Sequence, residues 1–240
     1  MLYYLILISI LFGNLEHKNL NTEIQNKDYL LGKFNPAQHP DFELIRVKYA
    51  DKSGMYLRKE VYAAFKRMHI AAKKENINLT IVSATRNFDY QKSIWEKKWK
   101  TIQDKPRDVA NTDSQVALKI LKFSAMPGAS RHHWGTDIDI CDLNDAYFLT
   151  PKGKRIYAWL SQHASEYGFC QTYDKKELTG RTGYNEEKWH WSYQPTSMVF
   201  TKMAGEILKN EDLKGFSGCE VASEIDIVKN YILGLNNNCK

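Results

Sequence analysis

The chain has 240 residues, of which 43% are hydrophobic and 26% are charged. These proportions are typical of a soluble globular protein and exclude a largely disordered or membrane-embedded chain. The formal net charge is +6, but the sequence contains no basic helix with interleaved aromatic residues, so we expect no binding to nucleic acid.

An apolar run near the N-terminus decides the predicted compartment. Residues 2–12 are too few to cross a bilayer core of ~30 Å as a helix, and they resemble the hydrophobic region of a secretory signal peptide. We therefore predict a signal peptide over residues 1–14, secretion or a periplasmic location, and no membrane span once the signal is removed. No Lys or Arg precedes the run and no clear A-x-A site follows it, so a buried N-terminal strand or helix stays open as the alternative.

The next segment is polar and leads into the first clear helix. Residues 15–50 contain Pro36 and Pro40, and we predict that they form an extended arm around a catalytic domain over residues 51–200. From Lys59 onward, apolar residues recur at i, i+4, i+7 and i+11 and therefore share one helix face. These residues are Val61, Phe65, Met68 and Ala72.

The middle of the chain alternates between strand and helix patterns. Residues 78–84 alternate in polarity and predict a strand. Residues 90–101 predict a second helix, whereas residues 103–115 are polar, contain a proline and predict a loop. Residues 151–168 predict a third helix from their apolar spacing, and residues 201–240 predict a helical C-terminal cap in two pieces.

Two further strands are predicted, and both carry polar side chains on one face. In residues 136–140, Asp137 and Asp139 point to the same side because successive side chains alternate along a strand. Carboxylates on a sheet face are costly to bury unless they have partners. Residues 189–193 alternate in the same way and place His190 on the second strand.

The His and carboxylate residues of this region have the composition of a catalytic zinc site. Such a site uses three protein ligands and leaves one position open for water, with a carboxylate nearby to take the proton of that water. His132, Asp139 and His190 are the candidate ligands, which two adjacent strands would bring to one edge of a sheet. Glu187 is the candidate base. Glu187 precedes His190 by three residues, so in a regular strand the two side chains would point to opposite faces. We therefore expect Glu187 to lie in a turn just before that strand.

Three motifs, in this order along the chain, resemble those of the VanY-like D-alanyl-D-alanine carboxypeptidase family. This family belongs to the zinc metallopeptidase superfamily that also contains lysostaphin-type enzymes and the Hedgehog signalling domain. The pattern S-x-x-R-x-x-x-x-Q occurs at Ser83, Arg86 and Gln91. The pattern S-x-H-x-x-G-x-x-x-D occurs at Ser130, His132, Gly135 and Asp139. The pattern E-x-W-H occurs at Glu187 and His190.

The resemblance implies an α+β fold of the Hedgehog/D,D-peptidase type, with a small antiparallel sheet flanked by helices. It implies Zn²⁺ as cofactor and hydrolysis of the terminal D-Ala-D-Ala bond of peptidoglycan stem peptides. Glu187 would be the general base, and Arg86 would stabilise the oxyanion or hold a substrate carbonyl. The residues expected to contact substrate are Ser130, Gln91, Ser83 and Asp137. We expect a monomer.

Other activities fit the same motifs. An L,D-carboxypeptidase or a peptidoglycan endopeptidase would use the same metal site. An inactive, zinc-stabilised wall-binding module is an alternative from a different functional class. Such a module would tolerate the loss of Glu187 or Arg86, and because both are present we favour an enzyme.

The sequence departs from the common family form at one position and offers a rival ligand at another. The common form has Ala two residues before the metal-binding Asp, where this chain has Asp137. Asp137 can be a hydrogen-bond partner of a metal-bound His, or it can pair with Arg131 or Arg86. His133 is a rival to His132, but neighbours on an extended chain point in opposite directions, and the motif register selects His132.

Export would permit disulfide bonds. The chain has four cysteines, which allow three complete pairings. We predict that Cys219 pairs with Cys239 and fastens the C-terminal tail, with Cys141 and Cys170 as open alternatives.

Overall fold

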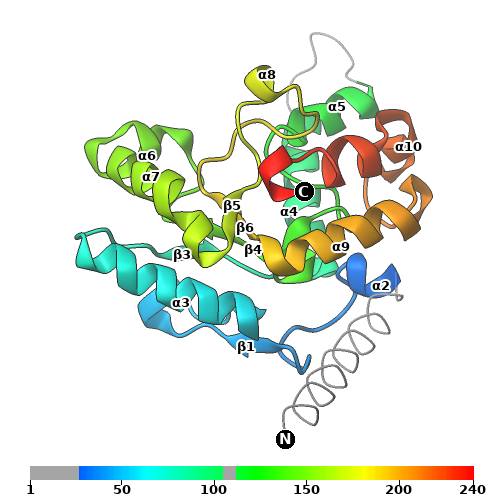
Figure 1. Ribbon diagram of the computed structural model, residues 1–240. Coiled ribbons are helices and arrows are strands. Elements are labelled where there is room, and N and C mark those ends of the chain that lie inside the picture. Colours follow the sequence, from blue (N-terminus) through cyan, green and yellow to red (C-terminus); the bar gives the residue numbers. More distant parts are fainter. Residues whose placement is uncertain (1–26, 105–111) are drawn as a thin grey trace, which may run out of the picture.

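The computed structural model describes residues 27–104 and 112–240, which form an α+β fold (Figure 1). In this part of the chain the strands are β1 (Phe42–Leu44), β2 (Tyr56–Arg58), β3 (Ile81–Ser83), β4 (Asp137–Ile140), β5 (Phe169–Gln171) and β6 (His190–Tyr193). The α-helices are α2 (Lys27–Leu30), α3 (Lys59–Lys74), α4 (Phe88–Gln103), α5 (Asp113–Ile120), α6 (Asp145–Leu149), α7 (Pro151–His163), α8 (Lys176–Thr179), α9 (Gln194–Ile207) and α10 (Ala222–Ile225). The 3-10 segments η2 (Arg131–Trp134) and η3 (Ala164–Tyr167) and the π-helical segment η6 (Val228–Ile232) also bear on the site and its support.

Both sheets are antiparallel. Strands β1 and β2 form a two-stranded sheet, and the other four strands form a sheet of order β3-β4-β6-β5. The strands predicted over residues 136–140 and 189–193 are confirmed as β4 and β6, which are hydrogen-bonded neighbours. The strand predicted over residues 78–84 is shorter than expected, because regular pairing is limited to Ile81–Ser83 and a register shift interrupts it.

The four-stranded sheet lies between two apolar clusters. On one face, Ile138, Ile140 and Trp191 pack with the buried sides of α3 and α7 (Figure 1). The predicted apolar stripe of α3 is confirmed, since each of its four residues is fully buried. The second cluster is built from α2, α4, α5, α9 and the C-terminal residues. The polar face of β4 is therefore enclosed on the side opposite α3.

Helix boundaries differ from the predictions where capping residues intervene. Helix α4 begins two residues before the predicted start because Asn87 is its N-cap and accepts a hydrogen bond from the Tyr90 backbone N–H at 2.9 Å. The helix predicted over residues 151–168 becomes α7 followed by η3, and it ends at Gly168, which has a positive φ of 83°.

The loop predicted over residues 103–115 is partly wrong. Helix α5 begins inside it, because Thr112 and Gln115 form a reciprocal capping box around the helix start. Residues 105–111, which belong to the same prediction, lie outside the described residues.

The N-terminal segment is more than an extended arm. Its described part, residues 27–50, contains α2 and β1, and Leu30 and Leu31 are buried in the second cluster. The Trp134 indole N–H donates to the Leu30 carbonyl at 3.1 Å, which ties α2 to the segment before β4. The predicted signal peptide over residues 1–14 lies outside the described residues. Within the described ranges, no helix combines the length and apolar character needed to cross a membrane.

The C-terminal residues belong to the same core as the predicted catalytic domain. Helix α9 crosses the boundary predicted after residue 200, and its Phe200 and Ala204 are fully buried. Further along, η6 contributes Tyr231, whose ring packs against the Tyr184 ring at 5.0 Å between centroids. Because Tyr184 also lines the main cavity, the tail supports one wall of that cavity.

The predicted disulfide between Cys219 and Cys239 is wrong. Cys239 is bonded to Cys170, and Cys141 and Cys219 are free. The tail returns to β5 at this point, where the Asn236 backbone N–H donates to the Thr172 carbonyl at 3.0 Å. This contact places Cys239 beside the strand that carries Cys170.

We expect the Cys170–Cys239 bond to stabilise the fold substantially. It closes a loop with a sequence separation of 69 residues, and removing a native disulfide from a small secreted domain typically costs about 2–5 kcal/mol of unfolding free energy. Cys170→Ser/Cys239→Ser should therefore unfold at a lower denaturant concentration than the oxidised parent. Cys219→Ser is the control and should match the parent. Equal midpoints for the double variant and the oxidised parent would contradict the assigned pair.

Candidate metal centre

Three side chains from different elements converge on one point. His132 comes from η2, Asp139 from β4 and His190 from β6, where Asp139 and His190 are direct register partners. His132 Nε2 is 3.3 Å from His190 Nδ1, and the two Asp139 oxygens lie 3.3 Å and 3.0 Å from these two nitrogens. All three side chains are buried, and one ligand atom from each lies within 4.8 Å of the others. The structure thus brings together the predicted ligand set.

The outer nitrogen of each ring is already hydrogen-bonded. His132 Nδ1 donates to the Ala84 carbonyl at 2.8 Å, and His190 Nε2 donates to Asp137 Oδ1 at 3.0 Å. These bonds place protons on the outer nitrogens and leave the inner nitrogens free to bind a cation. Metal-binding histidines usually have such partners, and two His and one Asp suit zinc. The residues present therefore fit a zinc ion.

His133 does not point toward this cluster. Its Nδ1 donates to the Arg86 carbonyl at 2.6 Å, and its Nε2 accepts from the Gly128 backbone N–H at 3.0 Å. Complete burial lowers the pKa of His133 to about 3, which keeps the ring neutral. Both ring nitrogens are thus used within the fold, and the rival ligand is excluded by geometry.

Burial and close charges set the ionisation of the cluster. Burial lowers the pKa of His132, and the nearby Arg86 lowers it further. Burial also acts to lower the pKa of His190, but the hydrogen bonds to Asp137 and Asp139 outweigh it and raise the pKa to about 9. A cation that binds at Nδ1 of His190 would therefore displace a proton from that nitrogen. Desolvation acts to raise the pKa of Asp139, yet the two histidines hold it well below its ordinary value. The ligand carboxylate is therefore ionised.

Glu187 lies in a turn immediately before β6, as predicted. Its carbonyl accepts from the His190 backbone N–H at 3.3 Å, and its own N–H donates to the Tyr173 carbonyl at 2.9 Å. The turn directs the carboxylate back to the cluster, where Oε2 lies 3.6 Å from His190 Nδ1. Burial raises the pKa of Glu187 to about 8, and the negative charge of Asp139 adds to the effect.

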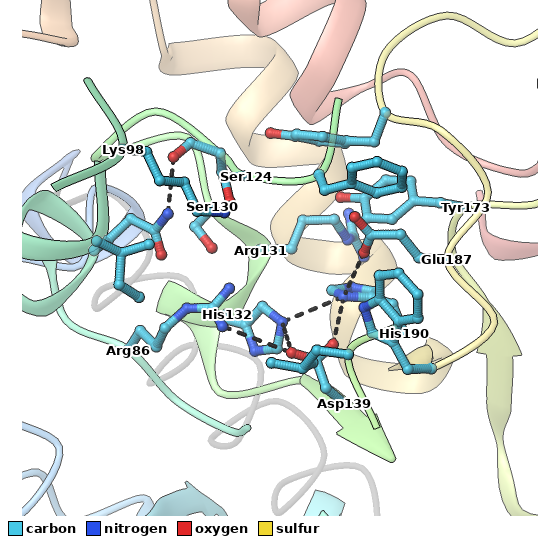
Figure 2. Close-up of a pocket in the computed structure, with 17 residues that line it drawn as sticks. Arg86, Lys98, Ser124, Ser130, Arg131, His132, Asp139, Tyr173, Glu187 and His190 are labelled. Carbon is cyan, nitrogen blue, oxygen red and sulfur yellow. Dashed lines mark hydrogen bonds and ion pairs between the residues drawn. The ribbon is translucent and has the colours of Figure 1, made fainter. Parts of the chain in front are cut away.

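Arg86 lies beside the cluster, on the side away from Glu187 (Figure 2). Its guanidinium is 3.6 Å from Asp139 Oδ2 and donates to the Ser83 hydroxyl at 2.7 Å. Its backbone N–H donates to the His132 carbonyl at 3.2 Å, which fastens the loop after β3 to η2. Ser83 does not line the cavity above the cluster. Ser83 therefore supports Arg86, and its predicted contact with substrate stays a prediction.

Asp137 does not line this cavity either. Its side chain is fully buried beneath the cluster and pairs with Arg131 Nε at 3.1 Å as well as with His190. The prediction that Asp137 contacts substrate is therefore corrected, because no surface of this residue is accessible. The sequence left several partners of Asp137 open, and the structure shows that Asp137 contacts Arg131 and His190.

The other predicted site residues line the cavity. Gln91 and Ser130 face it, and Gln91 Nε2 donates to the Ala125 carbonyl at 2.8 Å. The Gln91 Oε1 atom is buried without a hydrogen-bond partner in the described part of the chain. The hydrogen-bonding capacity of the Gln91 amide is therefore only partly satisfied within the described fold.

The cavity residues that sequence reasoning missed include Lys98, Ser124 and Tyr173. Figure 2 shows Lys98 and Ser124 together on one side and Tyr173 beside Glu187 on the other. Lys98 follows Gln91 by seven residues on α4, so it lies on the same helix face. This spacing was the available signal for Lys98. Ser124 and Tyr173 lie in irregular segments, where the sequence carries no equivalent pattern.

An antiparallel sheet flanked by helices, with a buried His–Asp–His cluster beside a carboxylate, is an arrangement typical of metallopeptidases. Comparison with known proteins identifies the family. The model of the VanY family, described as D-alanyl-D-alanine carboxypeptidase, matches residues 54–196, which is more than half of the chain. The protein therefore belongs to the VanY family of peptidases, as its motifs indicate.

Two related sequences support this assignment over different lengths. The protein YodJ of Bacillus subtilis, which is named a putative carboxypeptidase, is 32% identical over 201 residues, covering 78% of this chain and 63% of YodJ. A D-alanyl-D-alanine carboxypeptidase of Enterococcus faecalis is 28% identical over 125 residues, covering 51% of this chain and 42% of that protein. The chain thus spans less than two thirds of the length of either relative.

Solved structures confirm the fold class. VanYB in complex with D-alanine-D-alanine superposes with a TM-score of 0.50 and 25% identity, over 74% of this chain and 90% of VanYB. The LD-carboxypeptidase LdcB superposes with a TM-score of 0.50 and 25% identity, over 80% of this chain and 79% of LdcB. The α+β fold of the Hedgehog/D,D-peptidase type, predicted from the motifs, is therefore confirmed.

Proposed function

We propose that this protein is a zinc-dependent D,D-carboxypeptidase that removes the terminal D-alanine from peptidoglycan stem peptides. One arrangement carries the proposal. A buried His–Asp–His cluster forms the floor of a cavity, with the Glu187 carboxyl on one side and the Arg86 guanidinium on the other (Figure 2). The family description and the dipeptide bound to VanYB support the choice of substrate.

The side chains around the cluster have separate tasks in such a reaction. A zinc ion held by His132, Asp139 and His190 would polarise the scissile carbonyl and acidify the attacking water. Glu187 accepts the proton of that water and returns it to the leaving amine. Arg86 supplies fixed positive charge close to the developing oxyanion. The low exposure of Glu187, 5%, keeps competing bulk water away from this proton transfer.

One wall of the cavity favours a substrate with a free carboxylate. Lys98 donates to the Ser124 hydroxyl and makes no ion pair with a carboxylate among the described residues. Ser130 and Gln91 lie on the same cavity surface. Charged donors bind carboxylates through short, strong hydrogen bonds. A carboxypeptidase substrate ends in such a group and an endopeptidase substrate does not, so this wall supports a carboxypeptidase.

Mass spectrometry of defined muropeptides tests the proposal. With zinc-loaded protein, we expect a stem pentapeptide ending in D-Ala-D-Ala to lose one alanine, while the tetrapeptide product stays intact. A pentapeptide with an amidated C-terminus is the matched control and should resist cleavage. Cleavage of the tetrapeptide alone would instead indicate an L,D-carboxypeptidase, and cleavage within the stem an endopeptidase. Binding of muropeptides without cleavage would indicate a wall-binding module.

We also propose that the protein acts outside the cytoplasm, secreted or in the periplasm, as a monomer. The Cys170–Cys239 bond supports an oxidising compartment, and the proposed substrate is a cell-wall peptide. Recovery of the protein in the cytoplasmic fraction with reduced cysteines would contradict the location. Gel filtration with light scattering checks the monomer.

A further inference from the structure

The ring of His190 lies between two carboxylates of one strand. Asp139 Oδ1 is 3.0 Å from Nδ1 of the ring, and Asp137 Oδ1 is 3.0 Å from Nε2. The two carboxylates share a face of β4 because they are two residues apart, and the register places Asp139 opposite His190. A flip of the ring would exchange both nitrogens for carbon atoms and lose both contacts. The two carboxylates therefore select one ring orientation.

The Asp137 carboxyl is itself held in place by buried donors. In addition to His190, its Oδ1 accepts from Arg131 Nε at 3.1 Å. Its Oδ2 accepts from the Ser192 hydroxyl at 3.0 Å and from the Thr136 hydroxyl at 2.5 Å. A carboxylate with this many donors has a fixed orientation. The oxygen that accepts from His190 is thus fixed relative to the sheet.

Arg131 extends this network to another element. Its guanidinium donates to the Thr201 hydroxyl of α9 at 2.7 Å and to the Ser192 hydroxyl at 2.9 Å. It also lies 4.8 Å from the ring centroid of Trp134. Arg131 directly precedes His132 in η2. The segment that carries the ligand His132 therefore also fixes Asp137, the carboxylate that orients His190.

We propose that Asp137 is a positioning residue of the metal centre, which aims Nδ1 of His190 at the metal and is fixed in turn by Arg131. The inference rests on the proposed zinc site. It adds Asp137 to that site as a residue that does not bind the metal but holds one of its ligands, His190. Outer hydrogen bonds of this kind typically contribute about 10–100-fold to metal affinity. Asp137 has no access to substrate, so its effect acts through His190.

A purely structural role for Asp137 makes a different prediction. Asp137 and Arg131 are 0% and 2% exposed, so each charge needs the other in the folded interior. If Asp137 only neutralises Arg131, removing both charges restores every property of the parent. If Asp137 orients His190, removing both charges restores stability but leaves metal affinity reduced.

The decisive variant is therefore Arg131→Met/Asp137→Ala, compared with the parent in metal-free form. Differential scanning calorimetry gives the unfolding temperature, and competition with a chromophoric chelator gives the zinc dissociation constant. We expect an unfolding temperature close to that of the parent and a zinc dissociation constant about 10–100-fold higher. The visible absorption of the Co²⁺-loaded protein should also change, because one imidazole ligand loses its fixed orientation.

Two further variants complete the test. Thr201→Val removes a buried partner of Arg131 without touching the bond between His190 and Asp137, and it should bind zinc like the parent. Arg131→Leu/Asp137→Leu fills the site with apolar side chains and serves if the first double variant does not fold; it also removes the acceptor of the His190 ring and should lose zinc affinity in the same direction. Parent-like zinc affinity in either folded double variant overturns the inference and leaves the proposed function intact. A parent chain that binds no zinc overturns the proposed function and the inference with it.

Discussion

Replacing His190 with Ala will remove zinc and peptidase activity together. His190 contributes one of three converging ligand atoms, and its Nδ1 lies 3.0 Å from one Asp139 oxygen and 3.3 Å from His132 Nε2. Loss of an outer partner alone typically weakens metal binding about 10–100-fold, so loss of the ligand itself should exceed ~100-fold. The measurement is zinc content after dialysis, alongside hydrolysis of a peptide ending in D-Ala-D-Ala.

Metal removal from the parent should have the same effect and should be reversible. A chelator is expected to abolish hydrolysis and added zinc to restore it. Penicillin should have no effect, because the proposed mechanism contains no serine nucleophile. His163→Ala is the matched control, because His163 lies on α7, is partly exposed, pairs with Glu166 and does not line the cavity. This variant should keep one zinc per chain and full activity. Full activity in a verified metal-free parent would refute the metal dependence.

The metal cluster was predictable because its residues match the motifs of the family, and the strand pattern agrees with that match. Alternation along residues 136–140 places Asp139 on a polar face, and the same alternation places His190 on the neighbouring strand. The offset of three residues between Glu187 and His190 does not fit a strand, which predicted the turn that the structure contains. Local periodicity and one pairing between strands account for Asp139, His190 and Glu187, whereas the choice of His132 over His133 came from the motif register.

Features that depend on the path of the whole chain were not predictable in the same way. The pairing of Cys239 with Cys170 depends on the return of the tail to β5, and cysteine spacing carries no record of that path. The burial of Asp137 depends on α9, whose Thr201 completes the network around Arg131. The sequence predicts that a carboxylate lies on one face of a strand, but it does not predict which element covers that face.

Glu187→Gln will separate catalysis from metal binding. Glutamine has the size and shape of glutamate but cannot take a proton from water. If Glu187 is the general base, the rate of hydrolysis should fall by about 10²–10⁴-fold or more, the usual contribution of a positioned acid–base group. Zinc content should stay at the parent level, because the three predicted ligands are unchanged.

The neighbouring carboxylate provides the matched control. Glu186 pairs with Lys188 at 3.1 Å and does not line the cavity, whereas Glu187 faces the cluster at 3.6 Å from His190 Nδ1. Glu186→Gln removes the same charge one residue away and should hydrolyse the peptide at nearly the parent rate with the same zinc content. A Glu187→Gln variant that cuts as fast as the parent would show that another group accepts the proton. A slow Glu186→Gln variant beside a fast Glu187→Gln variant would transfer the role to Glu186, and the turn before β6 would then have to present the other side chain to the cavity in the working enzyme.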